Sequence, residues 1–116
     1  MPKKLRPVLS DILAAIEGME QATADLTYRD FEQSWVVRHA VQRGIEIVSE
    51  AVRRIPDDAL AQYPDIQWTN IKAIGNILRH QYHDIRDNIV WNIVEVHLPP
   101  LKRAIAAMLA DLVENK

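Results

Sequence analysis

The chain has 116 residues, of which 48% are hydrophobic and 26% are charged, and it contains no cysteine. A chain of this length buries enough surface for one hydrophobic core, so we predict a single domain over residues 1–116. The formal net charge of -2 gives no overall positive field, so any contact with nucleic acid depends on a local basic patch. Without cysteine, disulfide bonds and thiolate zinc sites are excluded.

The N-terminal sequence is basic, but it is not typical of an export signal or a membrane anchor. Lys3, Lys4 and Arg6 are followed by a stretch in which Ser10 and Asp11 interrupt the apolar positions. No apolar run is long enough to cross a bilayer. We therefore expect a cytoplasmic protein without membrane contact, whose basic terminus is solvated rather than bound to phosphate.

Apolar residues recur at helical spacing along most of the chain. The stripe from Val8 to Met19 follows Pro7 and predicts a first helix that ends near Leu26. The stripe from Val37 to Val52 predicts a second, longer helix that stops before Pro56.

The second half of the chain predicts three further helices. Residues 55–68 hold two prolines and form the main connection, with room for one short turn. Helices are then expected over 69–82, over 87–96, and from the double proline at 99–100 to the C-terminal end. Short connections favour antiparallel neighbours, so the predicted fold class is all-α, an antiparallel up-and-down bundle of four to five helices.

The predicted helix over 69–82 carries an uncommon set of polar side chains. On a helical wheel its isoleucines and Leu78 occupy one arc. The other arc and its continuation hold Lys72, Gly75, Asn76, Arg79, His80, Tyr82 and His83. Solvated helices mostly carry Glu and Lys, so this mixture of imidazole, phenol and guanidinium is a candidate reactive site. A plain solvated face is the alternative interpretation.

The order of these residues resembles the HepT-like branch of the HEPN superfamily. Asn76, apolar residues and then His80-Gln81-Tyr82 are followed by "DIRDNIVWNIVEVHLPPLK". The segments "LSDILAAIEGME", "GIEIVSEAVRRIP" and "PDIQW" extend the resemblance over nearly the whole chain. It implies a HEPN-like helical bundle that forms a homodimer and acts as a ribonuclease toxin without metal or other cofactor. Its implied partner is a minimal nucleotidyltransferase antitoxin.

The family motif is an arginine followed a few residues later by a histidine, with asparagine after the arginine and tyrosine two residues after the histidine. Carried over to this sequence, Asn76, His80 and Tyr82 match, whereas the motif arginine falls on Gly75. Arg79 lies one turn later, and we expect its guanidinium to reach across the space that Gly75 leaves empty.

The resemblance implies cleavage of RNA with His80 as the acid and base. An imidazole can take the proton from a ribose 2′-hydroxyl near neutral pH, and Arg79 would stabilise the charge on the phosphate. Lys72 and His83 are candidate phosphate contacts. The resemblance also implies that the antitoxin attaches AMP to Tyr82, which would block the site by charge and bulk.

Two other functions stay open at this point. The glycine at position 75 is compatible with a catalytically silent HEPN subunit that binds a nucleotidyltransferase partner or a nucleotide. A purely structural helical oligomer is the third interpretation. A metal pair made by His80 and His83 with Asp84 or Asp87 is weaker, because paired histidines without a defined third ligand are poor evidence, so no metal site is predicted. For His80 itself, the structural alternative to a catalytic role is an interface histidine that is hydrogen-bonded to Asp84, one turn further on.

The remaining aromatic and acidic residues are interpreted as structural. The three tryptophans are expected to pack between helices or at a dimer seam rather than to stack on RNA bases: Trp35, Trp68 and Trp91. Glu46 and Glu50 are one turn apart and are interpreted as a solvated edge rather than a paired-carboxylate site.

The other two histidines lie outside the motif. His39 is expected on the polar face of the second helix. His97 is expected to cap a helix before the double proline.

Overall fold

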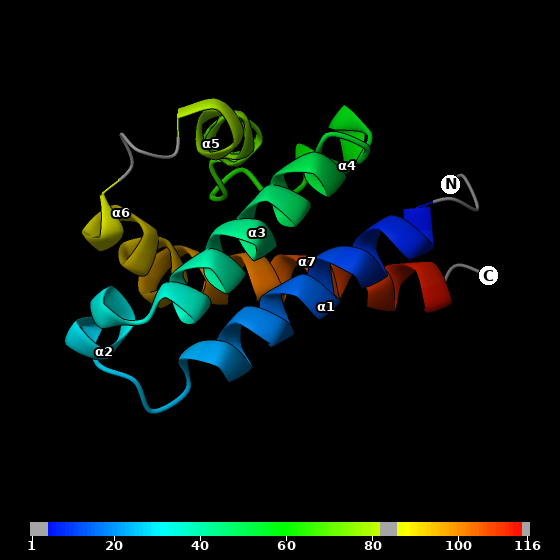
Figure 1. Ribbon diagram of the computed structural model, residues 1–116. Coiled ribbons are helices and arrows are strands. Elements are labelled where there is room, and N and C mark those ends of the chain that lie inside the picture. The colour runs from blue at the N-terminus through cyan, green and yellow to red at the C-terminus, as the bar shows by residue number, and fades with distance from the viewer. Residues whose placement is uncertain (1–4, 82–85, 115–116) are drawn as a thin grey trace.

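The computed structural model describes residues 5–81 and 86–114, and over these residues the chain is helical and contains no strand (Figure 1). Four helices are long: α1 (Leu5–Thr23), α3 (Trp35–Val52), α5 (Trp68–Gln81) and α7 (Leu98–Glu114). Three are short: α2 (Tyr28–Gln33), α4 (Asp57–Leu60) and α6 (Asp87–Asn92). A π-helical turn, η2 (Ile93–His97), joins α6 to α7. The predicted all-α bundle is confirmed.

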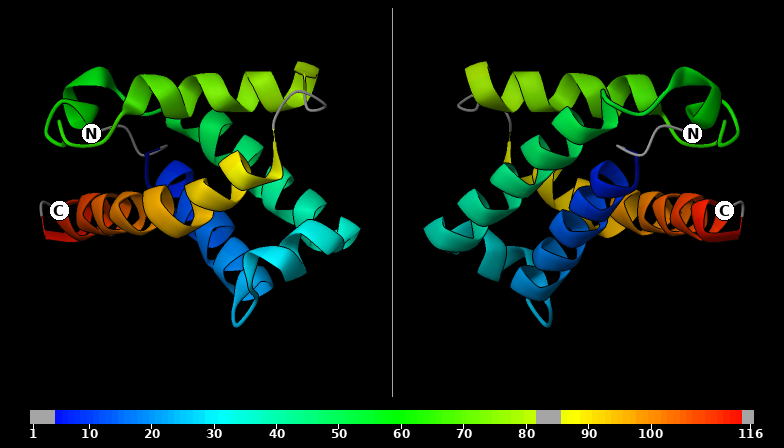
Figure 2. Two further views of the ribbon diagram at one scale, coloured as in Figure 1. Left: turned by 90° about the vertical axis from the view of Figure 1, so that its left-hand side faces the viewer. Right: turned by 90° about the vertical axis from the view of Figure 1, so that its right-hand side faces the viewer.

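The long helices pack in a fixed order around α1 and α3. α1 lies along α3 and also contacts α7, while α5 packs mainly against α3 (Figure 2). Helix α5 therefore lies at the outside of the bundle, with one side against α3. This position leaves much of its surface available for function.

The core is apolar and is built from every long helix. Its most deeply buried large side chains are Leu9, Ile12, Ile16, Phe31, Val41, Val52, Val90 and Ile105. Burial of each such side chain stabilises the fold by about 1.5–3 kcal/mol. Trp91 is half-buried, and its ring lies 5.1 Å from that of Phe31, so α6 is held against α2 by aromatic packing.

The first connection differs from the sequence prediction. α1 ends at Thr23 rather than near Leu26, and Asp25 has a positive φ of 63°, which redirects the chain after the helix. The short helix α2 was not predicted. Thr27 and Asp30 start it with a reciprocal capping box, in which each side chain accepts the other residue's backbone N–H.

The double proline lies at the start of α7, as predicted, but no loop separates α7 from the helical segment before it. Pro99 and Pro100 lie in the first turn of α7, and the Leu98 N–H donates to the Ile93 carbonyl oxygen in the wider π spacing. Proline has no N–H to donate to the carbonyl oxygen four residues earlier. The wider π turn accommodates the missing hydrogen bond without interrupting the helix. His97 lies inside a continuous helical segment, so its predicted role as a cap is wrong.

None of the helices within residues 5–81 and 86–114 combines the length and apolar character that a membrane crossing requires.

Candidate functional site

The helix that carries the motif is held to α3 by hydrogen bonds to its backbone. The Ser49 hydroxyl donates to the Lys72 carbonyl oxygen at 3.0 Å and accepts the Gly75 N–H at 3.2 Å. The Arg53 guanidinium donates to the same Lys72 carbonyl oxygen at 2.8 Å. Ser49 is only 2% exposed, so its hydroxyl bonds α5 in a dry contact where hydrogen bonds are not shared with water.

Gly75 lies on the face of α5 that packs against α3, and not on the polar face that the wheel predicted. A Cβ at this position would lie 2.5 Å from the Ser49 Cβ, far inside van der Waals contact. Ser49 therefore fills the place where the side chain of a motif arginine would begin. The expectation that Gly75 leaves an empty space for Arg79 is wrong.

Three predicted site residues lie together on the exposed side of α5. Asn76, Arg79 and His80 are all exposed in its C-terminal half, and Asn76 and His80 are one helical turn apart. Arg79 turns toward α3, where its Nη2 lies 3.6 Å from Oε2 of Glu50. Both side chains are about half exposed, so this ion pair is weak and easily exchanged for another anion.

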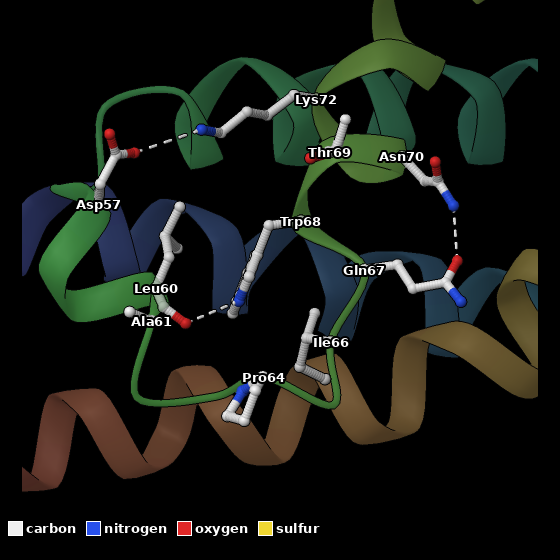
Figure 3. A pocket seen from close by; sticks show the side chains of 10 residues that line it. All are labelled: Asp57, Leu60, Ala61, Pro64, Ile66, Gln67, Trp68, Thr69, Asn70 and Lys72. Carbon is white, nitrogen blue, oxygen red and sulfur yellow. Dashed lines mark hydrogen bonds and ion pairs between the residues drawn. The ribbon is translucent and has the colours of Figure 1, made fainter.

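Lys72 lies toward the other end of α5. Its Nζ lies 3.7 Å from Oδ1 of Asp57 in α4, as Figure 3 shows. Lys72 and His80 are eight residues apart, or about 12 Å along the helix axis. The structure thus does not bring Lys72 together with the group formed by Asn76, Arg79 and His80.

A shallow depression of about 710 Å³ lies beside Lys72 at the start of α5 (Figure 3). Its polar groups are mostly engaged with one another. The Trp68 indole N–H donates to the carbonyl oxygens of Leu60 and Tyr63, and Asn70 donates to the side chain of Gln67. This arrangement anchors the start of α5 and is consistent with a structural role.

Two predicted site residues, Tyr82 and His83, lie outside the described residues, as does Asp84. Their predicted roles stay predictions, including the alternative metal pair. Within the part of the chain that the structure describes, no group of three His, Asp or Glu side chains converges as metal ligands would.

The predicted structural residues are partly as expected. Trp68 is 9% exposed and Trp91 packs on Phe31, as predicted. Trp35 is 64% exposed, so it does not pack between the helices of one chain, and its predicted place at a dimer seam stays a prediction. His39 lies half-exposed beside it on α3.

Glu46 and Glu50 do not form a paired-carboxylate site. Glu46 lies 3.5 Å from the Arg43 guanidinium, while Glu50 is paired with Arg79. Each carboxylate has its own basic partner, so the alternative of a site built from the two is not supported.

The residues that position α5 were not predicted from the sequence. Ser49 was not singled out, although a small polar residue within the apolar stripe of α3 indicates a close helix contact. Arg53 was noted only as the end of a helix, and its bond to the Lys72 carbonyl oxygen needs the tertiary structure to be seen.

As a chemical group, Asn76, Arg79 and His80 present an amide, a guanidinium and an imidazole to solvent from one helix. The imidazole can exchange a proton, and the guanidinium and amide can donate hydrogen bonds to phosphate oxygens. The arrangement is suited to acid and base chemistry on a phosphodiester, and it contains its own cation.

Comparison with known proteins agrees with this chemistry. A family described as Ribonuclease HepT-like matches residues 12–108, which include all of α5. A protein of Methanocaldococcus jannaschii named "Putative RNase MJ0125" is 30% identical over 116 residues, covering 99% of this chain and 100% of the relative.

Two further relatives match this chain over most of its length and of their own. "Putative RNase MJ0127" of the same organism is 32% identical over 113 residues, covering 97% of this chain and 93% of the relative. "Probable ribonuclease HepT" of Thermococcus cleftensis is 31% identical over 102 residues, covering 88% of this chain and 93% of the relative. No solved structure matches the chain.

Proposed function

Because the chain belongs to the HepT-like ribonuclease family, we propose that it is a metal-independent RNA endonuclease with its site on the C-terminal half of α5. One observation carries the proposal: the family match includes α5, and on this helix Asn76 and His80, which the sequence resemblance aligns with the motif, are both exposed. The substrate is RNA rather than DNA, because the chemistry proposed below needs the 2′-hydroxyl.

In the proposed reaction, His80 acts as general base on a ribose 2′-hydroxyl. The oxygen attacks the adjacent phosphorus, the bond from phosphorus to the 5′-oxygen breaks, and that oxygen takes up a proton. The products are a 2′,3′-cyclic phosphate and a 5′-hydroxyl. A second copy of His80 in a homodimer is suited to supply the proton to the leaving oxygen.

Arg79 is proposed to stabilise the phosphate in the transition state. It is the cation next to His80 in the sequence, and its exposed ion pair with Glu50 leaves the guanidinium accessible to solvent. Bidentate donation from a guanidinium matches two phosphate oxygens, which the ammonium of Lys72 cannot reproduce. Asn76 is proposed as a further hydrogen-bond donor. Lys72 is the weaker candidate contact, because it is paired with Asp57 at the far end of α5.

The biological role that we propose is the toxin of a toxin-antitoxin system in the cytoplasm. A minimal nucleotidyltransferase antitoxin would neutralise it, by binding and by attaching AMP to Tyr82. An AMP group two residues after His80 adds negative charge and bulk beside the site, which would repel RNA. Inspection of the adjacent open reading frame tests the pairing directly.

We propose that the active form is a homodimer. Ile89 and Val96 are 46% and 54% exposed. They lie on the segment formed by α6 and η2, beside a groove of about 320 Å³ that Ile71, Ile74 and Ile93 help to line. Exposed apolar side chains next to an apolar groove are typical of an interaction surface, and pairing about a two-fold axis would cover them.

A second candidate function rests on Gly75. Ser49 occupies the place where the motif arginine would begin, and a chain that has lost this arginine is suited to partner binding without cleavage. In this case the protein is a silent HEPN subunit that binds the nucleotidyltransferase or a nucleotide.

Cleavage of RNA by the purified protein in EDTA tests the first proposal. Wild-type protein is expected to release fragments that end in cyclic phosphate, and His80→Ala should abolish cleavage while the helical circular dichroism is unchanged. Absence of cleavage by the wild type, with tight binding to the neighbouring nucleotidyltransferase, would support the silent subunit instead.

A further inference from the structure

The start of α3 carries an exposed aromatic stack that the proposed reaction does not use. The Trp35 indole is 64% exposed, and its ring centroid lies 4.0 Å from that of His39 with an angle of 27° between the planes. The Nδ1–H of His39 donates to the Trp35 carbonyl oxygen at 2.7 Å, which fixes the imidazole under the indole. One face of the indole is thus covered by His39, and a large part of the ring is open to solvent.

The same side of α3 leads from this stack to the candidate site. Trp35, His39, Arg43 and Glu50 fall within about 80° of arc on the helix, so they form one continuous strip. Glu50, at the far end, is the ion-pair partner of Arg79. The distance along the helix from Trp35 to Glu50 is about 22 Å, which is the length of a few nucleotides of extended RNA.

The start of α3 is also joined to the helix that follows the motif. Arg38 Nε lies 3.9 Å from Oδ1 of Asp87, the first residue of α6. α6 is the next helix after α5. The aromatic stack therefore lies at the end of α3 that contacts the start of α6.

We propose that Trp35, supported by His39, is a stacking platform for an unpaired base of the RNA, several nucleotides away from the bond that is cut. This inference rests on the proposed function and adds a subsite to it. The exposed indole would stack on the base, and Arg43, whose side chain is 71% exposed, is placed to meet the phosphate backbone between the platform and Arg79.

The features of this patch favour a base over a second copy of the chain. The indole is supported by an imidazole, a flat polar ring, and its strip continues with the exposed cation Arg43 rather than with an apolar residue. A stable protein interface buries about 800 Å² on each partner around an apolar centre, and Val36 is the adjacent large apolar side chain on this turn of α3. Stacking on one ring needs only the area of a base.

Fluorescence anisotropy with a labelled single-stranded RNA of about twelve nucleotides tests the platform. The protein carries His80→Ala so that cleavage does not interfere. Trp35→Ala is expected to weaken binding by about five- to a hundredfold, and Trp35→Phe by much less, because a phenyl ring still stacks. The matched control is Val36→Ala, which removes the exposed neighbouring side chain and should leave the affinity unchanged.

Oligonucleotides with a single abasic site provide the sharper test. For the protein that retains Trp35, one or two abasic positions should weaken binding, and for the Trp35→Ala protein the same positions should have no effect. Equal RNA affinity with and without the Trp35→Ala substitution would overturn the platform and leave the proposed nuclease site intact. Absence of any RNA binding would overturn both proposals.

Light scattering separates the platform from a contact between copies. The mass of the Trp35→Ala protein is expected to equal that of the wild type. If the substitution converts a dimer to a monomer, Trp35 belongs to a dimer seam and the platform is wrong.

Discussion

Ser49 of α3 and Gly75 of α5 are in direct contact where the two helices cross. The serine hydroxyl accepts the glycine N–H at 3.2 Å, and a Cβ on residue 75 would lie 2.5 Å from the serine Cβ. The two positions are therefore coupled. A side chain at position 75 fits only if the side chain at position 49 is removed or if the two helices move apart. The position of α5, and with it the position of His80, depends on this contact.

The first prediction is that Gly75→Ala destabilises the protein by about 1–3 kcal/mol, because the added methyl group overpacks the crossing. The gain in helix propensity offsets only part of this cost. Urea unfolding followed by circular dichroism measures the change. Ser49→Gly in the same chain should recover much of the loss, giving a favourable coupling energy in a double-mutant cycle.

Gly18→Ala is the matched control. Gly18 also lies within a helix, but a Cβ there would meet no atom within 4 Å. Its replacement should stabilise the protein by about 0.5–1 kcal/mol through helix propensity alone. If Gly75→Ala and Gly18→Ala both stabilise the chain, the close contact with Ser49 is wrong.

The Ser49 contact also explains which part of the site the sequence could predict. Hydrophobic periodicity located α3, α5 and α7, because each has an apolar stripe long enough to define a helix. Periodicity misjudged the rotation of α5, because the wheel assigned Gly75, which has no apolar side chain, to the polar face. Backbone packing against a serine is not visible in a hydrophobic pattern.

Three isoleucines contributed to the wrong prediction of how α5 is rotated. The predicted buried face also contained Leu78, which is 2% exposed as expected, but Ile71, Ile74 and Ile77 are only half-buried. The first two line a groove. The short helix α2 was missed for a different reason, since Phe31 is its single fully buried side chain and six residues are too few for a periodic signal.

The second prediction concerns stability in acid. The pKa of Asp30 is lowered because the backbone N–H of Thr27 donates to its carboxylate, with the Thr27 side chain as a second hydrogen-bonding group. A lowered pKa in the folded state means that the contribution to stability is complete above the ordinary carboxyl pKa and is lost as the pH falls through the lowered value.

The free energy of unfolding of wild type and Asp30→Ala should therefore differ by a constant amount at neutral pH. The difference should shrink once the pH falls below about 4, where the unfolded carboxylate takes up its proton. Urea titrations across this range measure it. Asp11→Ala, which removes an exposed carboxylate from α1, is the control for a general loss of negative charge. A difference that grows on acidification would contradict the capping role.

The third prediction is a homodimer in solution, which light scattering at micromolar concentration measures. Val96→Asp should shift the mass toward the monomer, because a carboxylate would be buried in the proposed apolar contact. Ala110→Asp is a control on the exposed side of α7 and should leave the mass unchanged. A monomer mass for the wild type would remove the second His80 from the proposed reaction.

The last prediction decides whether Arg79 replaces the missing motif arginine. If it does, Arg79→Ala should lower cleavage of RNA by about a hundredfold or more, which is the usual cost of removing a donor to a transition-state oxyanion. Arg79→Lys should recover little, because a point charge does not reproduce bidentate geometry. Arg103→Ala, which removes an exposed guanidinium from α7, is the control and should cleave like the wild type.

The complementary experiment rebuilds the motif. Gly75→Arg alone should unfold more readily than wild type, because its Cβ meets Ser49, so it must be combined with Ser49→Gly. In a chain that also carries Arg79→Ala, this pair should restore cleavage if a guanidinium from either position reaches the same phosphate. Suppose instead that wild-type protein never cleaves RNA and the Ser49→Gly, Gly75→Arg protein does. Arg79 is then no substitute, the closed contact between Ser49 and Gly75 is what silences the nuclease, and α5 serves partner binding.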